Sequence, residues 1–159
     1  MEIRIGIGYD SHRFIVERPF YLGGVQIPYE SGLLGHSDGD ALIHAIIDAI
    51  LGALNWGDIG KWFPDNDPEL KDIRSTVLLS KVKDKLIQEH IRIVNIDSVV
   101  ILEEPKIAPF VDSMRETISQ ILCIEKERVS IKGKTNEGMG FVGRKEGVQV
   151  FAVVILEIP

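Results

Sequence analysis

The stretch that decides the fold is Val148-Gln149-Val150-Phe151-Ala152-Val153-Val154-Ile155-Leu156, in which every residue but one is apolar. A strand with one face in water alternates apolar and polar side chains, whereas the strand predicted over 148–158 is apolar on both faces. This strand is therefore either the central strand of a sheet, or a strand with one face buried against another subunit. We expect the chain to form an oligomer.

The sequence before this strand alternates between strand and helix patterns. Apolar residues at every second position predict strands, and apolar residues spaced by three or four predict helices. The resulting order, roughly β-β-α-α-β-α-β-β, predicts an α+β fold in which a mixed sheet carries helices on one face. With 159 residues and no linker or repeat, the chain is expected to form one domain, 1–159. The predicted strands are 2–9, 20–22, 91–102 and 129–134, and the predicted helices are 41–54 (capped by Ser37 or Asp38), 76–89 and 111–122.

The composition excludes two classes of partner. The 24 acidic residues outnumber the 18 basic ones, which are scattered, and the net charge is −6, so a nucleic-acid partner is not expected. The acidic net charge still allows a small phosphate ester as a ligand, because a metal ion and a few hydrogen-bond donors can dominate the local electrostatic field. No stretch reaches the roughly 18 apolar residues that span a bilayer, and we expect no targeting segment ahead of the first strand. We expect a soluble protein of the cytoplasm or an organelle matrix, with its one cysteine, Cys123, buried as a small hydrophobe.

Three residues form the sharpest candidate site. If the first strand continues, Asp10 and His12 project to the same side. His44 lies one helical turn after Asp40 and one turn before Asp48. A carboxylate with two imidazoles binds zinc or a similar divalent ion, and either helical aspartate would then accept the other ring N–H of His44. The alternative is a helix histidine paired with Asp40 or Asp48 beside an ordinary polar turn.

Two further segments carry polar side chains suited to chemistry. The cluster His36-Ser37-Asp38 precedes the helix of His44 and serves either a site or a helix cap. The turn 132–141 offers Lys and Thr donors and a carboxylate, as a phosphate-binding turn would. It is not a P-loop, because no glycine stands ahead of Gly133 at the spacing that motif needs and no helix pattern follows. The irregular segment 55–74 is long enough to be a functional loop.

A series of short motifs runs from the first predicted strand to the last. The motifs are Gly6-Ile7-Gly8-Tyr9-Asp10-Ser11-His12, Leu22-Gly23-Gly24, Gly35-His36-Ser37-Asp38-Gly39-Asp40, His44-Ala45-Ile46-Ile47-Asp48-Ala49, Gly57-Asp58-Ile59-Gly60, Phe63-Pro64-Asp65, Pro105-Lys106 and Gly140-Phe141-Val142-Gly143-Arg144-Lys145-Glu146-Gly147. No single motif is decisive, but the ordered series is very hard to obtain by chance. Taken together, the motifs resemble the 2-C-methyl-D-erythritol 2,4-cyclodiphosphate synthase family.

The resemblance implies a homotrimeric enzyme with active sites between subunits. Its substrate would be 4-diphosphocytidyl-2-C-methyl-D-erythritol 2-phosphate, whose 2-phosphate attacks the β-phosphorus, closes a cyclic diphosphate and expels CMP. The enzyme would be a phosphorus–oxygen lyase of the non-mevalonate isoprenoid pathway, in the bacterial cytoplasm or, after removal of a transit peptide, in the plastid stroma. Two rivals remain: a metal-dependent phosphoesterase that hydrolyses its substrate, and a non-enzymatic trimeric carrier of isoprenoid diphosphates.

The resemblance also implies roles for individual residues. Asp10, His12 and His44 would bind Zn²⁺ or a similar ion, and Glu137 would help hold Mg²⁺ or Mn²⁺ on the diphosphate. His36 and Thr135 would stabilise the charge of the transition state. Asp10, His12 and Glu137 would also touch the substrate. The methylerythritol phosphate would contact Ser37, Asp58, Gly60, Phe63 and Asp65, and the cytidine diphosphate would contact Pro105, Lys106, Lys132 and Lys134. Phe141 and Arg144 would lie near a trimer axis that could bind an isoprenoid diphosphate.

Two segments depart from the family pattern. Gly133-Lys134-Thr135 replaces the Ala-Thr-Thr of many members, which adds a positive charge beside the expected diphosphate. Ile73-Arg74-Ser75 replaces a more usual Ala-Asp-Ser, so any role for position 74 is open, while a role for Ser75 stays plausible. Neither departure affects the three predicted zinc ligands.

Overall fold

The computed structural model describes all residues from 1 to 159 and is built on one mixed sheet. Its five strands are ordered β4-β1-β7-β5-β6, with β5 and β6 parallel and the other neighbours antiparallel. A separate two-stranded hairpin joins β2 to β3. The bounds are β1 (Glu2–Val16), β2 (Phe20–Leu22), β3 (Val25–Ile27), β4 (Ser31–Leu33), β5 (Arg92–Ile101), β6 (Val129–Lys134) and β7 (Gly147–Ile158).

The apolar C-terminal strand β7 is the central strand of this sheet. It pairs with β1 on one side and β5 on the other. Its side chains still alternate, since Val150, Ala152 and Val154 are buried while Phe151 and Val153 are exposed on the opposite face. The strand is therefore central in the sheet and also presents apolar side chains on a face that nothing in the monomer covers.

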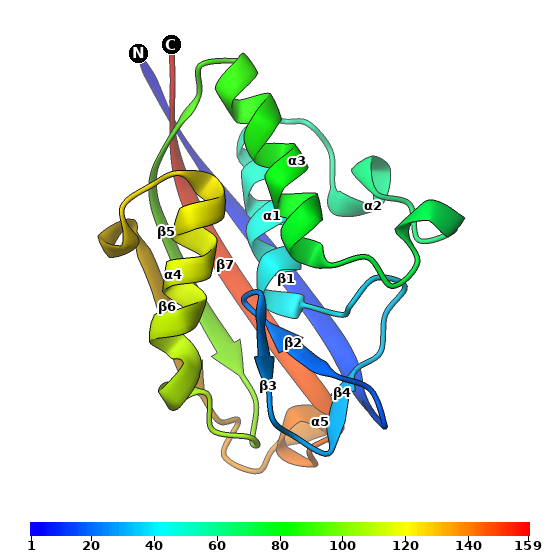
Figure 1. The fold of residues 1–159 in the computed structure, drawn as a ribbon. Coiled ribbons are helices and arrows are strands. Elements are labelled where there is room, and N and C mark those ends of the chain that lie inside the picture. Colours follow the sequence, from blue (N-terminus) through cyan, green and yellow to red (C-terminus); the bar gives the residue numbers. More distant parts are fainter.

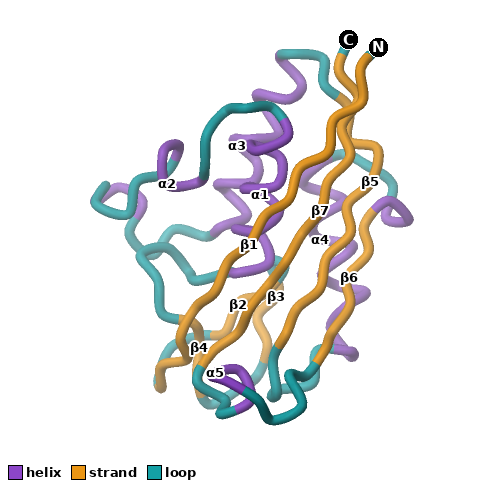
Figure 2. The backbone as a smooth tube through the Cα atoms, turned by 180° about the vertical axis from the view of Figure 1, so that it is seen from behind, coloured by secondary structure: helices purple, strands orange, loops and turns teal.

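All the long helices cover one face of the sheet (Figure 1). Seen from the other side, the strands lie in front of these helices and no helix crosses them (Figure 2). This arrangement confirms the predicted α+β architecture with helices on one face. The helices are α1 (Ala41–Ala53), α2 (Ile59–Trp62), α3 (Ser75–Gln88), α4 (Val111–Leu122) and α5 (Gly140–Gly143), with short 3₁₀ turns at Pro68–Leu70, Ala108–Phe110 and Lys126–Arg128.

Helix α1 packs directly on β1 because two glycines of the strand have no side chain. A Cβ on Gly6 would lie 1.8 Å from the carbonyl oxygen of Ala49, and a Cβ on Gly8 would lie 1.8 Å from that of Ala45. The helix is then enclosed between the sheet and α3, and eleven of its thirteen residues are buried. A helix buried on nearly all sides accounts for its nearly continuous apolar sequence.

The segment between β1 and α1 holds two strands that the sequence did not predict, β3 and β4. The first strand also runs to Val16, well past the predicted end, and is joined at its far end by β4 through Phe14. The N-cap of α1 is Asp40, which accepts a hydrogen bond from the Ile43 amide at 3.0 Å, so the prediction of Ser37 or Asp38 as the cap was wrong. No helix is long and apolar enough to cross a membrane.

Cys123 is exposed, contrary to the prediction of a buried residue. It ends α4 in the left-handed conformation, at a φ of 56°. That conformation reverses the chain direction at the helix C-terminus and turns the side chain away from the apolar face that Leu122 continues.

Candidate metal and substrate site

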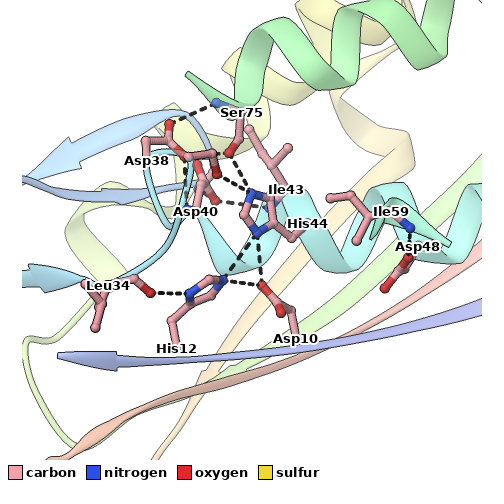
Figure 3. Close-up of polar contacts among 12 residues, drawn as sticks. Asp10, His12, Leu34, Asp38, Asp40, Ile43, His44, Asp48, Ile59 and Ser75 are labelled. Atoms are coloured by element: carbon pink, nitrogen blue, oxygen red, sulfur yellow. Dashed lines mark hydrogen bonds and ion pairs between the residues drawn. The ribbon is translucent and has the colours of Figure 1, made fainter. Parts of the chain in front are cut away.

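The three predicted metal ligands meet at one point (Figure 3). Asp10 and His12 come from β1, which is continuous through both residues, and His44 comes from the first turns of α1. The Oδ2 atom of Asp10 lies 2.8 Å from Nε2 of His12 and 3.1 Å from Nδ1 of His44. The two imidazole nitrogens are 3.3 Å apart. One ligand atom from each residue thus lies within 4.8 Å of the others, which confirms the predicted cluster.

The hydrogen bonds behind the two imidazoles determine which ring nitrogens carry protons. Nδ1 of His12 lies 2.6 Å from the carbonyl oxygen of Leu34, which can only accept, so this nitrogen donates. Nε2 of His44 lies 2.8 Å from the hydroxyl of Ser75, whose own proton goes to Oδ1 of Asp38 at 2.5 Å. The hydroxyl therefore accepts from His44. Each ring then directs an unprotonated nitrogen toward the third ligand.

This donor set fits a divalent cation. Burial alone would raise the pKa of Asp10, but hydrogen bonds from His12 and His44 outweigh it and lower that pKa. Burial likewise opposes the charge of His12, but the Asp10 carboxylate raises its pKa above the ordinary value. When both rings are neutral and have the protons assigned above, two nitrogen lone pairs and the carboxylate oxygen converge within about 3 Å, and they repel one another unless a cation lies between them. A carboxylate with two imidazoles is a common ligand set of zinc.

The helical aspartates do not hold the second nitrogen of His44, so that prediction was wrong. Asp40 accepts from the amides of Gly23 and Gly24 at 2.9 and 2.7 Å, besides capping α1. Asp48 accepts from the Ile59 amide at 2.7 Å and so holds the start of α2. Burial raises the pKa of both carboxyl groups. The hydroxyls of loop and α3 residues lie closer to the ring than either carboxylate does.

A cavity of about 510 Å³, the cluster pocket, opens beside the three ligands. It brings them together with five other predicted residues: His36, Ser37, Gly60, Phe63 and Asp65. The ring of His36 is held by a bond of 2.7 Å from Nε2 to the carbonyl oxygen of Asp67. Asp58 does not line this cavity; its carboxylate accepts from the Lys61 amide at 2.9 Å and caps α2.

A second cavity of about 460 Å³, the lysine pocket, lies where β5 and β6 end and shares no lining residue with the first. It is lined by Pro105, Lys106, Lys134 and Thr135 among others. Glu103 shapes its rim by accepting from the amides of Asn136 and Gly138 at 2.8 and 3.3 Å. The structure thus brings these four predicted residues together.

Besides Asp58, four predicted residues lie outside both pockets. Lys132 forms an ion pair with Asp97 on the neighbouring strand. Glu137 is exposed in the turn after Thr135 and is not part of the three-residue cluster. Phe141 lines a smaller hollow of about 200 Å³, and Arg144 pairs with Glu146 at 2.8 Å on the exposed surface next to it. The roles proposed for these four residues stay predictions.

Comparison with known proteins decides the family. The family described as the YgbB family matches residues 3–157. A protein of Caldicellulosiruptor bescii named 2-C-methyl-D-erythritol 2,4-cyclodiphosphate synthase is 55% identical over 153 residues, or 96% of this chain and 98% of that protein. A protein of the same name from Fusobacterium nucleatum is 50% identical over 155 residues, or 98% and 97%. This chain belongs to the YgbB family of cyclodiphosphate synthases.

Solved structures related to the YgbB family share the whole fold. The bifunctional IspDF of Campylobacter jejuni has a TM-score of 0.95 at 42% identity, covering 99% of this chain, which spans 43% of that longer protein. IspF of Plasmodium falciparum in complex with CDP has a TM-score of 0.86 at 39% identity, covering 99% of this chain and 96% of that one. The resemblance inferred from the motifs is confirmed.

Some residues that matter to this YgbB family site were not predicted. The Leu34 carbonyl and the Glu103 carboxylate act through contacts with the site residues, and no local sequence signal marks them. Asp38 and Ser75 meet behind His44 although they are 37 positions apart. The sequence signals were the place of Asp38 in a matching motif and of Ser75 in the segment Ile73-Arg74-Ser75, and neither indicated what the two residues contact.

Proposed function

We propose that this chain converts 4-diphosphocytidyl-2-C-methyl-D-erythritol 2-phosphate into the 2,4-cyclodiphosphate and CMP. An oxygen of the 2-phosphate forms a bond to the β-phosphorus, and the bond from that phosphorus to the CMP oxygen breaks, with the electron pair leaving on CMP. The reaction consumes no water, so we propose a phosphorus–oxygen lyase in which residues 1–159 act as one catalytic domain. The observation that carries the proposal is the convergence of Asp10, His12 and His44 beside the cluster pocket in a chain of this family.

The chemistry requires charge neutralisation and alignment more than a strong base. The attacking phosphate is already ionised at neutral pH, and the barrier lies in bringing two anions into line. A divalent ion at Asp10, His12 and His44, which we propose to be Zn²⁺, would supply positive charge there. We propose that Glu137 helps to hold a second ion, Mg²⁺ or Mn²⁺, on the diphosphate.

His36 and Thr135 are proposed to stabilise the developing charge. The ring of His36 gives its Nε2 proton to the Asp67 carbonyl, so it must also carry a proton on Nδ1 to donate to a phosphate. The Thr135 hydroxyl accepts from the Glu137 amide at 3.3 Å, which leaves its own proton free for a phosphate oxygen. Thr135 therefore has a donor available for the substrate, and His36 has one when its ring carries both protons.

The two pockets suggest where each end of the substrate binds. We propose that the cluster pocket takes the methylerythritol phosphate, with Ser37, Gly60, Phe63 and Asp65 as its lining, and that Asp58 acts from the edge. The lysine pocket would take the cytidine diphosphate against Pro105, Lys106 and Lys134, with Lys132 nearby. A nucleotide site agrees with the CDP complexes of related structures.

A homotrimer is proposed because the sheet leaves a large apolar face without cover. Ile5 and Ile7 of β1 are each 69% exposed, beside Phe151 and Val153 of β7 at 38% and 39%. A contiguous apolar face of this kind is typical of a subunit interface. Association would bring the cluster pocket of one subunit to the lysine pocket of the next, and Phe141 and Arg144 to an axis where an isoprenoid diphosphate could bind. We propose the bacterial cytoplasm as the compartment, or the plastid stroma if a transit peptide has been removed.

The test is product analysis by phosphorus NMR on the purified protein with substrate and Mg²⁺. We expect cyclic diphosphate and CMP, and a loss of rate on the order of 10³-fold or more in the His44→Ala variant or after chelation. His90→Ala, at an exposed position after α3, is the matched control and should be fully active. CMP with a linear phosphate product would instead establish a hydrolase. An absence of turnover together with ligand binding that survives chelation would establish a carrier.

A further inference from the structure

A chain of hydrogen bonds and one ion pair runs from His44 to the surface through α3. We propose that Ser75, Asp38 and Arg74 are positioning residues that orient the imidazole of His44 and strengthen its bond to the metal. This inference rests on the metal site of the proposed function. The role is not catalytic, because none of the three faces the converging ligand atoms.

The first step of this chain is the contact behind the imidazole. Ser75 lies at the start of α3, is fully buried, and places its hydroxyl 2.8 Å from Nε2 of His44. Its proton goes to Asp38, so the hydroxyl can only accept from the ring. Ser37 is the other hydroxyl near this nitrogen, at a longer 3.1 Å. A ligand histidine that donates its other N–H toward a carboxylate is held in orientation and becomes a stronger base.

The second step is the way in which the carboxylate is held. Asp38 is 5% exposed, and Oδ1 accepts from the Asp40 amide at 3.1 Å as well as from the Ser75 hydroxyl. Oδ2 accepts from the Ser75 amide at 2.9 Å and from Nε of Arg74 at 3.2 Å. With donors on both oxygens, the carboxylate cannot rotate without the loss of several hydrogen bonds. A buried carboxylate held in this way is a fixed negative end for the chain.

The third step is the ion pair of Arg74, a residue whose role was left open by the sequence analysis. A buried carboxylate is costly without a cation, and Arg74 supplies the one ion pair that Asp38 makes. The guanidinium is fixed by a second bond of 2.9 Å to the Gly24 carbonyl and lies 4.0 Å from the centre of the Tyr21 ring. The β2–β3 hairpin is thereby linked to the metal ligand on α1.

The experiment measures zinc affinity directly, by competition with a chromophoric chelator. We expect Ser75→Ala to weaken zinc binding by about 10- to 100-fold, and Ser75→Thr, which keeps the hydroxyl, to remain within about threefold of the wild type. Ser98→Ala removes another buried hydroxyl, one bonded to the Ser130 carbonyl far from the cluster, and should leave zinc affinity unchanged. Arg74→Gln, at a partly exposed side chain, should weaken zinc binding by about threefold to tenfold.

Proton NMR of the metal-free protein detects the hydrogen bond from His44 to Ser75 directly, and this signal would not change if Ser75 served only the stability of the fold. The Nε2 proton of His44 should give a slowly exchanging downfield signal in the wild type and in Ser75→Thr, and should lose it in Ser75→Ala. Unchanged zinc affinity in folded Ser75→Ala, or an unchanged signal, would overturn the proposal. If Ser75→Ala does not fold, Arg74→Gln decides, and an affinity equal to that of the wild type would overturn the role of the chain.

The same measurements separate this inference from the proposed function. A wild-type protein that does not bind zinc would contradict the metal site, while the NMR signal would still decide whether Ser75 holds His44. If the wild-type protein binds zinc and Ser75→Ala binds it equally tightly, the positioning role is contradicted but the metal site is not.

Discussion

The cluster pocket and the lysine pocket are built in opposite ways. In the cluster pocket, His36 and the two ligand histidines are each held from behind by a carbonyl or hydroxyl group. In the lysine pocket, Lys106 and Lys134 form no ion pair, whereas the neighbouring Lys132 and Lys145 do. The first pocket depends on the packing of buried elements, and the second depends on unpaired positive charge. Changes in packing should therefore affect the first pocket, and changes in charge or salt should affect the second.

The largest separation of the two pockets is expected from Gly8→Ala. The added Cβ would collide with the Ala45 carbonyl, so α1 must move away from β1, at a cost of about 3 kcal/mol in the free energy of unfolding. Because His44 moves with α1, zinc affinity should fall by about tenfold or more, while CDP affinity should change by less than about threefold. Urea unfolding and titration calorimetry measure these quantities.

Gly52→Ala is the control for this prediction. Its Cβ would meet only the Ile7 carbonyl oxygen, at an ordinary 3.8 Å, on the same side of α1. Replacement of a helical glycine by alanine should stabilise the protein by about 0.5–1 kcal/mol and leave both affinities unchanged. If Gly8→Ala behaved like Gly52→Ala, close packing of α1 on β1 would not determine the metal site.

A smaller effect is expected from Lys134→Thr, which acts on the other pocket. Loss of one unpaired cation should weaken CDP binding by about fivefold to tenfold and make it less sensitive to salt. Zinc affinity should not change, since the pockets share no residue. Titration calorimetry at two salt concentrations measures both, with the exposed Lys81→Thr on α3 as control. An equal loss of CDP affinity in Lys81→Thr would contradict a local role for Lys134.

The smallest expected effect is on the pH dependence of stability, which tests the protonation of His12 in the cluster pocket. In the metal-free protein the pKa of His12 is raised above 6.5, so its stabilising proton is fully bound below that pH and is lost as pH rises through the folded-state value. Zinc binding requires unprotonated rings and strengthens as pH rises. From about pH 6 to 8, the melting temperature should fall in chelated protein and rise in zinc-loaded protein. Parallel slopes would contradict the assigned ring protons, and Lys134→Thr should leave both slopes unchanged.

The sequence predicted the features that depend on periodicity. The alternation of the first strand placed Asp10 and His12 on one side, and the three-to-four spacing of 41–54 placed His44 on a helix. The strands β3 and β4 have only three residues each, too few for a periodic pattern, and were missed; β2 is equally short but was predicted because Gly23-Gly24 closes it. They form because the chain after β1 turns back and pairs, β4 with β1 and β3 with β2, and these contacts do not follow from local sequence.

The error at the N-cap of α1 has a long-range cause. Ser37, Asp38 and Asp40 are all good caps by residue type, and the choice among them was made by the remote amides of Gly23 and Gly24, which also require Asp40. Asp38 was then free to contact Arg74 and Ser75 on another segment. Long-range hydrogen bonds of this kind determine a site, but a single sequence does not reveal them.

The separation of the two pockets has a consequence for inhibitor design. Since no residue lines both, a fragment that fills one cavity should leave the shape of the other unchanged, and hits for each can be improved independently. A metal-binding group suits the fragment for the cavity beside Asp10, and an acidic group suits the fragment for the cavity beside Lys134. Once linked, the two fragments should gain affinity from their high effective concentration at the second cavity.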